Sequence, residues 1–364
     1  MEKVMSRKLI TISTIMTLMS TSVIADVPNV AADIAPIHSL VSRVMDGVGA
    51  PKLIVQSGAS PHGYRLRPSE AKALQDADHV FWMGEELTPW LDSAIGTLAS
   101  KASVTTLLDQ QGVILHDFRE GALFEAHDHS AHGDDDHDDH DDHDDHDDHK
   151  DHDDHDDHKD HDDHDDHDDH DDHKDHKDHD DHNDHDDHDD HDDQGSHDPH
   201  AWLSPENAKL WLNIIASKLS VSDPENAATY FMNAAAGQAE IEAMIAEVKA
   251  TLKPVQGGKF VVFHDAYQYF ENDFDFYASG AISLGDSSDP SPARIEKVQK
   301  RIRDEGIQCV LAEPQFKKGL VATVMEGSDA TASVIDPLGA ELETGPKLYT
   351  RLIKNMAKTL RNCL

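Results

Sequence analysis

The 364-residue sequence has little cysteine, few basic side chains and almost no long apolar runs. Lys and Arg number 31 against 73 Asp and Glu, giving a formal net charge of −42, so we expect no nucleic-acid partner. After the first 25 residues no stretch is long and apolar enough to cross a membrane. The HExxH pattern typical of zinc hydrolases is also missing, so we expect no catalytic residues and no enzyme.

Most of the negative charge lies in one stretch, residues 127–194, which mainly repeats the triplet Asp-Asp-His. The stretch holds 37 Asp, 4 Lys and 22 of the 29 His, and therefore −33 of the net charge. It offers almost no apolar side chain to bury and its carboxylates repel one another, so we expect a disordered insert. A repeat of three residues does not keep His on one face of a helix. The repeat therefore indicates a chemical role.

The residue types of this insert favour metal capture. Neutral imidazoles suit zinc, copper or nickel, and carboxylates add oxygen donors and attract cations. A solvated acidic tract that only keeps the protein soluble is the alternative, but solubility does not require His at every third position. The composition does not select one metal, because imidazole-rich sites follow the general affinity order of the first-row metals.

The start of the chain is typical of a secretory signal peptide. Residues 1–25 contain basic residues, then an apolar and Thr-rich core, then small or permissive residues before Asp26. The apolar run is too short for a membrane anchor, and no lipobox cysteine follows it. We expect export to the periplasm as a free protein whose mature chain begins near Asp26.

The two cysteines, Cys309 and Cys363, both lie in the last part of the chain. A disulfide between them would tie the C-terminus to a strand, with a stabilisation of about 4 kcal/mol on chain-entropy grounds. Two separate thiols are the alternative. Export to an oxidising compartment favours the disulfide.

Outside the signal and the insert, short apolar runs alternate with helical patterns, which predicts α/β lobes with mainly parallel sheets. We expect an N-terminal lobe at 26–222, which includes the insert, one long rigid helix at 223–253, and a C-terminal lobe at 254–364. The expected strands are 27–34, 53–55, 79–83, 104–108, 260–263, 308–312 and 333–336.

Ligands of open α/β sheets bind beyond the carboxyl ends of the strands, and four residues of types that can bind metals lie at such places. His62 follows the second expected strand, His200 lies between the insert and a helix, and His264 and Asp336 each end a strand. Taken singly, each residue is weak evidence for a metal site, because a lone His after a strand is more often a capping or core residue. We interpret three further His as structural or solvated: His38, His79 and His116.

Several ungapped motifs occur in order along the chain: SPH followed by YRLRPSE, then PHAWLSPE, FHDAYQYF, CVLAEPQF, IDPLG and a near-terminal Cys. With its acidic, His-rich insert, the chain resembles the zinc-specific periplasmic solute-binding proteins of ABC importers, the ZnuA type of the metal-binding cluster A-I family. The resemblance implies two α/β lobes bridged by a long helix, with a metal held between them. It also implies that His62, His200 and His264 are imidazole ligands, and that Cys309 pairs with Cys363.

Three imidazoles at about 2.0–2.1 Å suit a tetrahedral Zn²⁺ site with one place left. Some relatives have Glu just before the first His, but this chain has Pro61, which offers no donor. Water or Asp336, which resembles the fourth ligand of manganese-binding relatives, would then fill the last place. A third imidazole in place of a carboxylate shifts the preference from manganese toward zinc.

Two functions follow from these observations. The first is a monomeric protein that captures Zn²⁺ between its lobes and delivers it to an inner-membrane ABC permease and its ATPase, while the insert gathers metal. The second is a periplasmic metal buffer without a transport partner.

Overall fold

The computed structural model describes residues 27–119, 124, 197–283, 290–316 and 318–364. The expected signal peptide, 1–25, and the expected disordered insert, 127–194, both lie outside the described residues. None of the helices in the part of the chain that is described is long and apolar enough to span a bilayer.

The first sheet is parallel throughout and has the strand order β2-β1-β3-β4. Its strands are β1 (Val30–Ala32), β2 (Lys52–Leu53), β3 (His79–Trp82) and β4 (Ser103–Thr106). The helices connecting them are α1 (Ala35–Val44), α2 (Pro68–Gln75) and α3 (Pro89–Leu98). Each of these helices has Pro in its first two positions, where the missing N–H costs no hydrogen bond and the fixed φ suits the helix.

The second sheet repeats this arrangement with the order β6-β5-β7-β8 and only parallel pairs. Its strands are β5 (Phe260–His264), β6 (Ala281–Ser283), β7 (Cys309–Ala312) and β8 (Thr331–Val334). The helices here are α6 (Gln268–Phe274), α7 (Pro292–Glu305) and α8 (Lys318–Met325). The fold class is the predicted one: α/β with two parallel sheets. The short elements α6 and β6 were not predicted, because seven and three residues are too few to give a periodic signal.

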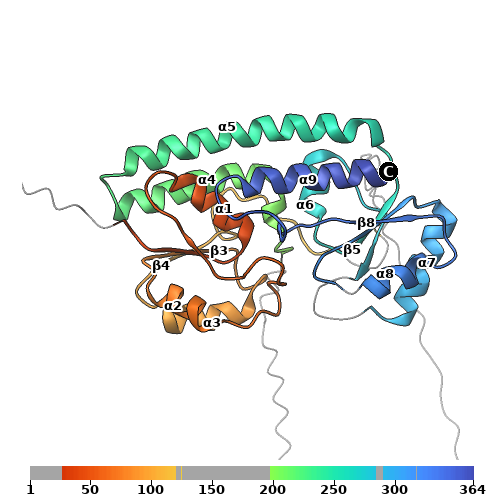
Figure 1. The fold of residues 1–364 in the computed structure, drawn as a ribbon, viewed down its shortest axis with the longest axis horizontal. Coiled ribbons are helices and arrows are strands. Elements are labelled where there is room, and N and C mark those ends of the chain that lie inside the picture. Colours follow the sequence, from red (N-terminus) through yellow and green to blue (C-terminus); the bar gives the residue numbers. More distant parts are fainter. Residues whose placement is uncertain (1–26, 120–123, 125–196, 284–289, 317) are drawn as a thin grey trace, which may run out of the picture. The chain divides into compact units, whose positions relative to one another are not determined.

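Three longer helices pack together beside the sheets: α4 (Pro205–Ser222), α5 (Ala227–Leu252) and α9 (Leu348–Cys363). Helix α5 contacts α4, α9 and α1, and Figure 1 shows it beside α9. At Gly237 a Cβ would come within 2.9 Å of the Leu212 side chain, so this glycine allows α4 and α5 to approach closely. Helix α5 begins at Ala227 and not at the predicted 223, because Asp223 instead accepts hydrogen bonds from Asn226 and Tyr230.

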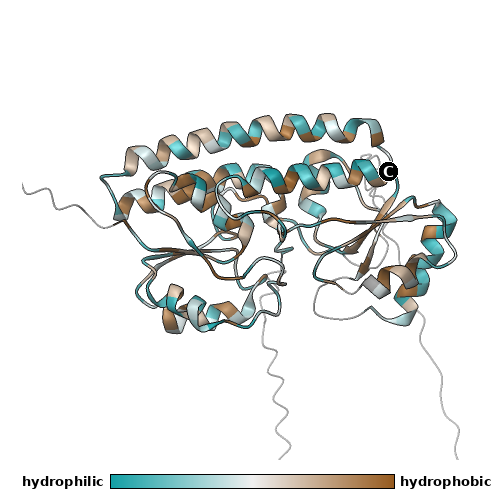
Figure 2. Ribbon diagram, viewed as in Figure 1, coloured by the Kyte–Doolittle hydropathy of each residue, from teal (hydrophilic) through white to brown (hydrophobic). Residues whose placement is uncertain are grey.

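Both sheets are covered on two sides, as expected for parallel sheets. Alternate residues of β3 and β5 enter different cores: Phe81 and Val262 pack with α1, α4, α5 and α9, whereas Val80 packs with α2 and α3. Val261 packs instead with α7 and α8. In Figure 2 the strands β3 and β5 are accordingly brown, while α5 alternates between brown and teal. One core therefore contacts both sheets, and each sheet has a second core of its own.

The predicted disulfide is confirmed. Cys309 in β7 is bonded to Cys363, the last residue of α9, with 5.6 Å between their Cα atoms. Strand β8 ends at Val334, so Asp336 lies two residues beyond the strand and not at its end as predicted.

Candidate metal centre

Three of the predicted ligands, although distant in sequence, lie next to one another. His264 is the last residue of β5, His200 precedes a short 3-10 turn (Ala201–Leu203) that leads to α4, and His62 lies in the loop after β2. The ring centroids are 5.2 Å apart for His200 and His264, and 5.5 Å apart for His62 and His200. The structure therefore brings together imidazoles from the end of β5, the loop after β2 and the segment before α4.

In two of these rings, the Nδ1 atom lies at hydrogen-bond distance from a buried carboxylate, a different one for each ring. His264 Nδ1 lies 2.5 Å from Glu313 Oε1, and His200 Nδ1 lies 2.6 Å from Asp198 Oδ1. Glu313 and Asp198 are only 3% and 1% exposed, so bulk solvent does not compete for these contacts. A carboxylate on Nδ1 favours the tautomer with its proton on that atom, and leaves the lone pair of Nε2 available for a metal.

The two Nε2 atoms face each other at a distance of 3.4 Å. Two nitrogens bound at about 2.0–2.1 Å to one tetrahedral ion lie about 3.3–3.4 Å apart, so this separation matches the edge of a zinc tetrahedron. If both rings donate Nδ1–H to their carboxylates, two lone pairs point at each other, and only a cation or a proton between them relieves the repulsion. The pair is therefore suited to a metal ion.

The third ring, His62, is held near this pair through its neighbours. Trp90 Nε1 donates to the carbonyl of Pro61 at 2.7 Å, and the ring of Tyr64 packs on Trp90. Tyr64 also donates its hydroxyl hydrogen to buried Glu70 at 2.8 Å. As they stand, no three His, Cys, Asp or Glu side chains among the described residues form a group that could hold a metal ion. The structure shows two imidazoles at ligand spacing, with the third beside them.

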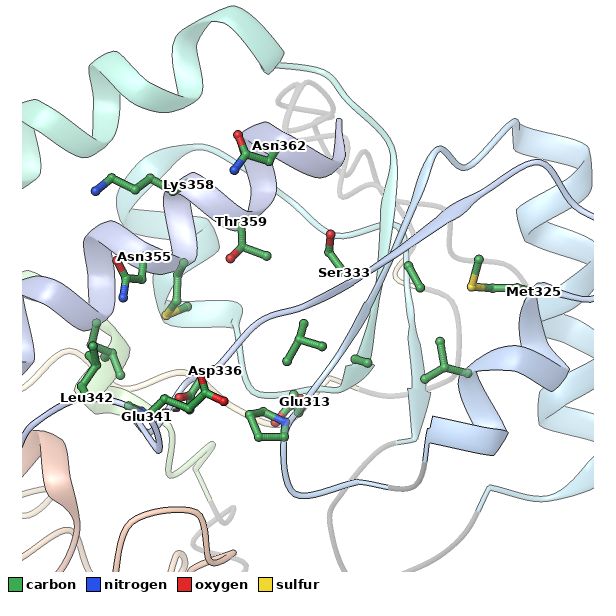
Figure 3. Close-up of a pocket in the computed structure, with 18 of the residues that line it drawn as sticks. Glu313, Met325, Ser333, Asp336, Glu341, Leu342, Asn355, Lys358, Thr359 and Asn362 are labelled. Atoms are coloured by element: carbon green, nitrogen blue, oxygen red, sulfur yellow. Dashed lines mark hydrogen bonds between the residues drawn. The ribbon is translucent and has the colours of Figure 1, made fainter.

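Asp336, the predicted alternative to water, already has hydrogen-bond partners. Its two carboxylate oxygens accept backbone N–H groups from Leu338, Gly339 and Ala340 at 2.6–3.0 Å. Together with Glu313 it lines a cavity of about 1010 Å³ beside β8 and α9, and Figure 3 draws both side chains among the residues that line it. The three N–H groups stabilise the carboxylate where it is, so ligation by Asp336 stays a prediction.

The sequence matches the family model described as "Zinc-uptake complex component A periplasmic" over residues 30–363. The chain belongs to this family. A high-affinity zinc uptake system protein ZnuA from Brucella abortus is 47% identical over 335 residues, which cover 92% of this chain and 91% of the relative. The Paracoccus denitrificans protein of the same name is 42% identical over 341 residues, 93% of each chain. A crystal structure of ZnuA has the same fold, with a TM-score of 0.64, 19% identity, and coverage of 93% of this chain and 99% of that one.

Membership in this family identifies the chain as the solute-binding part of a transport system and not an enzyme. The family is one of zinc uptake, and the imidazole pair suits zinc, since zinc accepts neutral nitrogen donors in a tetrahedron.

The three histidines interpreted as structural or solvated lie in other surroundings. His38 Nε2 contacts the carbonyl of Pro51, and His79, at the amino end of β3, contacts the hydroxyl of Ser222. Burial lowers the pKa of both rings, so both favour the neutral form. The ring of His116 packs on Tyr269.

Sequence reasoning did not find the carboxylates that hold the imidazoles. Asp198 lies two residues before His200, directly ahead of the PHAWLSPE motif, and Glu313 follows β7 within CVLAEPQF. Glu313 could have been found only from the pairing of β7 with β5, because neighbouring parallel strands bring their carboxyl ends together. That pairing is not readable from one sequence.

Proposed function

We propose that this protein binds Zn²⁺ through His62, His200 and His264, with water or Asp336 as the fourth ligand, and delivers it to an ABC permease and its ATPase in the inner membrane. The observation that carries the proposal is the 3.4 Å separation of His200 Nε2 and His264 Nε2, with each Nδ1 held by a buried carboxylate. The names of the zinc uptake relatives support zinc as the cargo and a transporter as the partner.

Residues 1–25 would direct the chain to the periplasm, where it would act as a monomer, and residues 127–194 would gather metal ions for the site. The Asp-Asp-His repeat supports this second role, because it combines many imidazoles with a local charge of −33. The insert would bind many ions weakly, and the three-His site would bind the one that is delivered.

A calorimetric zinc titration of the mature protein tests the proposal against a His62→Ala, His264→Ala double variant. We expect the variant to lose one tight binding event and to keep weak binding at several sites. The matched control is His79→Gln, which removes a buried imidazole at the amino end of β3 and should keep the tight event.

Survival of the tight event in the double variant would overturn this assignment. The 22 His of the insert would then be the main zinc site, and the periplasmic metal buffer would become the better explanation.

A further inference from the structure

A short segment before the insert contacts the residue next to one proposed ligand. We call residues 116–119 the strap. Its last side chain, Arg119, donates from Nε to both carboxylate oxygens of Asp265 at 3.0 Å, and Asp265 directly follows His264. Arg119 also donates from Nη1 to Glu271 in α6 at 2.6 Å. One guanidinium therefore links Asp265, in the turn that follows His264, to Glu271 in α6.

The same strap contacts the segment of the second ligand. The carbonyl of His116 accepts the N–H of Asp198 at 2.8 Å, and Asp117 pairs with His197 in an antiparallel bridge. The carboxylate of Asp198 in turn holds His200. A continuous series of contacts therefore runs from His264 through Arg119 and the strap to His200.

The charges make Arg119 difficult to replace. The side chains of Asp265 and Glu271 are 6% and 1% exposed, so two neighbouring carboxylates are buried and Arg119 supplies the cation that contacts both. Burial raises the pKa of the Glu271 carboxyl group, and Arg119 opposes that rise. The planar guanidinium offers parallel donors at fixed spacing, which an ammonium cannot reproduce. The ring of Phe124 covers the guanidinium, with Cζ 3.6 Å from the ring centroid.

We propose that Arg119 is a positioning residue of the zinc site. By fixing the turn after His264 and holding the strap against Asp198, it sets the separation between His264 Nε2 and His200 Nε2. The inference rests on the proposed function, since it assumes that these two atoms bind the metal. It adds a residue that donates to Asp265 and Glu271 and that comes from the segment leading into the insert.

The test compares Arg119→Met and Arg119→Lys with the wild-type protein, by zinc affinity and by the absorption spectrum of the Co²⁺-loaded protein, which reports ligand geometry. We expect Arg119→Met to bind zinc about 10- to 100-fold more weakly, as for other groups that orient metal ligands, and to change the Co²⁺ spectrum. Arg119→Lys should fold even if the Met variant does not. It should restore part of the affinity and leave the spectrum changed, because it keeps the charge without the planar fork.

Arg43→Met is the matched control. Arg43 also has a side chain 14% exposed and pairs with a carboxylate, Glu240, but it joins α1 to α5. Its replacement should lower the thermal stability and leave the zinc affinity and the Co²⁺ spectrum unchanged. If both Arg119 variants keep the wild-type affinity and spectrum, Arg119 is only a structural ion pair and the proposal is wrong.

The His62→Ala, His264→Ala variant separates this failure from that of the proposed function. If that variant loses the tight event while the Arg119 variants behave like wild type, only the positioning role fails. If the double variant keeps the tight event, the site itself is wrongly assigned and the positioning role fails with it.

Discussion

Two buried carboxylates hold the imidazoles, and the effect of each on zinc binding can be measured separately. Glu313 is buried, and its Oε1 holds His264 Nδ1. Removing that partner leaves the ring free to turn and takes away negative charge that offsets the charge of a bound cation.

We therefore expect Glu313→Ala to weaken zinc binding by about 10- to 100-fold, whereas Glu313→Gln keeps a hydrogen-bond acceptor and loses less. Competition with a chelator of known affinity measures both variants. Glu341, exposed and lining the same cavity, gives the control Glu341→Ala, which should bind zinc as the wild type does. Equal affinities for Glu313→Ala and Glu341→Ala would contradict the orienting role.

A second residue gives the fold a pH dependence of its own. Burial raises the pKa of Asp33, just after β1, to about 7, although the N–H groups of Ile34 and Met83 donate to it and lower the pKa. The folded pKa lies above the unfolded one, so Asp33 stabilises the fold most below about pH 4, and this contribution is lost as the pH rises toward 7.

Relative to Asp33→Asn, the free energy of unfolding of the wild type should fall by up to about 1.4 kcal/mol per pH unit between pH 4 and 7. Urea unfolding at several pH values gives the two slopes. Only the slopes are compared, because Asn would donate where one of the backbone N–H groups also donates, and so costs stability at every pH. Parallel curves would show that Asp33 does not titrate in this range.

At the scale of elements, the disulfide connects β7 of the second sheet to the end of α9. Cys309 is fully buried in the core that contacts both sheets, and Cys363 ends α9, which packs on α5 and α1. The bridge closes a loop across a sequence separation of 54 residues and so restricts the unfolded chain.

Reduction, or a Cys309→Ser, Cys363→Ser double variant, should lower the free energy of unfolding by about 4 kcal/mol on the chain-entropy estimate. Urea unfolding with and without reductant measures this loss. Reductant should have no effect on the double variant, and this comparison isolates the bridge. An unchanged unfolding midpoint on reduction of the wild type would mean that the bridge contributes little.

At the scale of the whole molecule, the expected function divides into a single site and a repetitive insert. Deleting 127–194 should leave one zinc event with near-wild-type affinity and remove most of the binding capacity. Loss of the tight event on deletion would contradict this division. The shortened chain keeps the strap and His197, which lie outside the deleted range.

Loading of the insert should also depend on pH. Imidazole binds metal only when it is neutral, and its ordinary pKa is about 6.5, so the extra ions should be released as the pH falls below that value. Zinc content after dialysis at pH 7.5 and pH 5 measures the release, with the deletion variant as the reference. Equal loading at both pH values would show that carboxylates, rather than imidazoles, hold the ions.

Local chemistry in the sequence was enough to predict much of this protein. Alternating apolar runs and helical patterns predicted the parallel α/β class and most of the strands, because buried parallel strands need continuous apolar residues. The motifs around His62, His200 and His264 predicted the family, and the family predicted the disulfide. The start of α5, the bounds of β8 and the existence of α6 and β6 were missed. Elements as short as α6 and β6 leave little periodic signal, and the side-chain hydrogen bonds that Asn226 and Tyr230 donate to Asp223 are not readable from the sequence.

Only the tertiary structure decided how these residues meet. His200 and His264 are 64 residues apart, yet their Nε2 atoms lie at the spacing of a zinc tetrahedron. The order β6-β5-β7-β8 brings Glu313 to His264, and the strap brings Arg119 to Asp265. The amino-acid sequence determines which donors exist, because their chemistry belongs to each side chain. Distances and tautomers depend on strand pairing and on burial, which arise only when distant segments pack together.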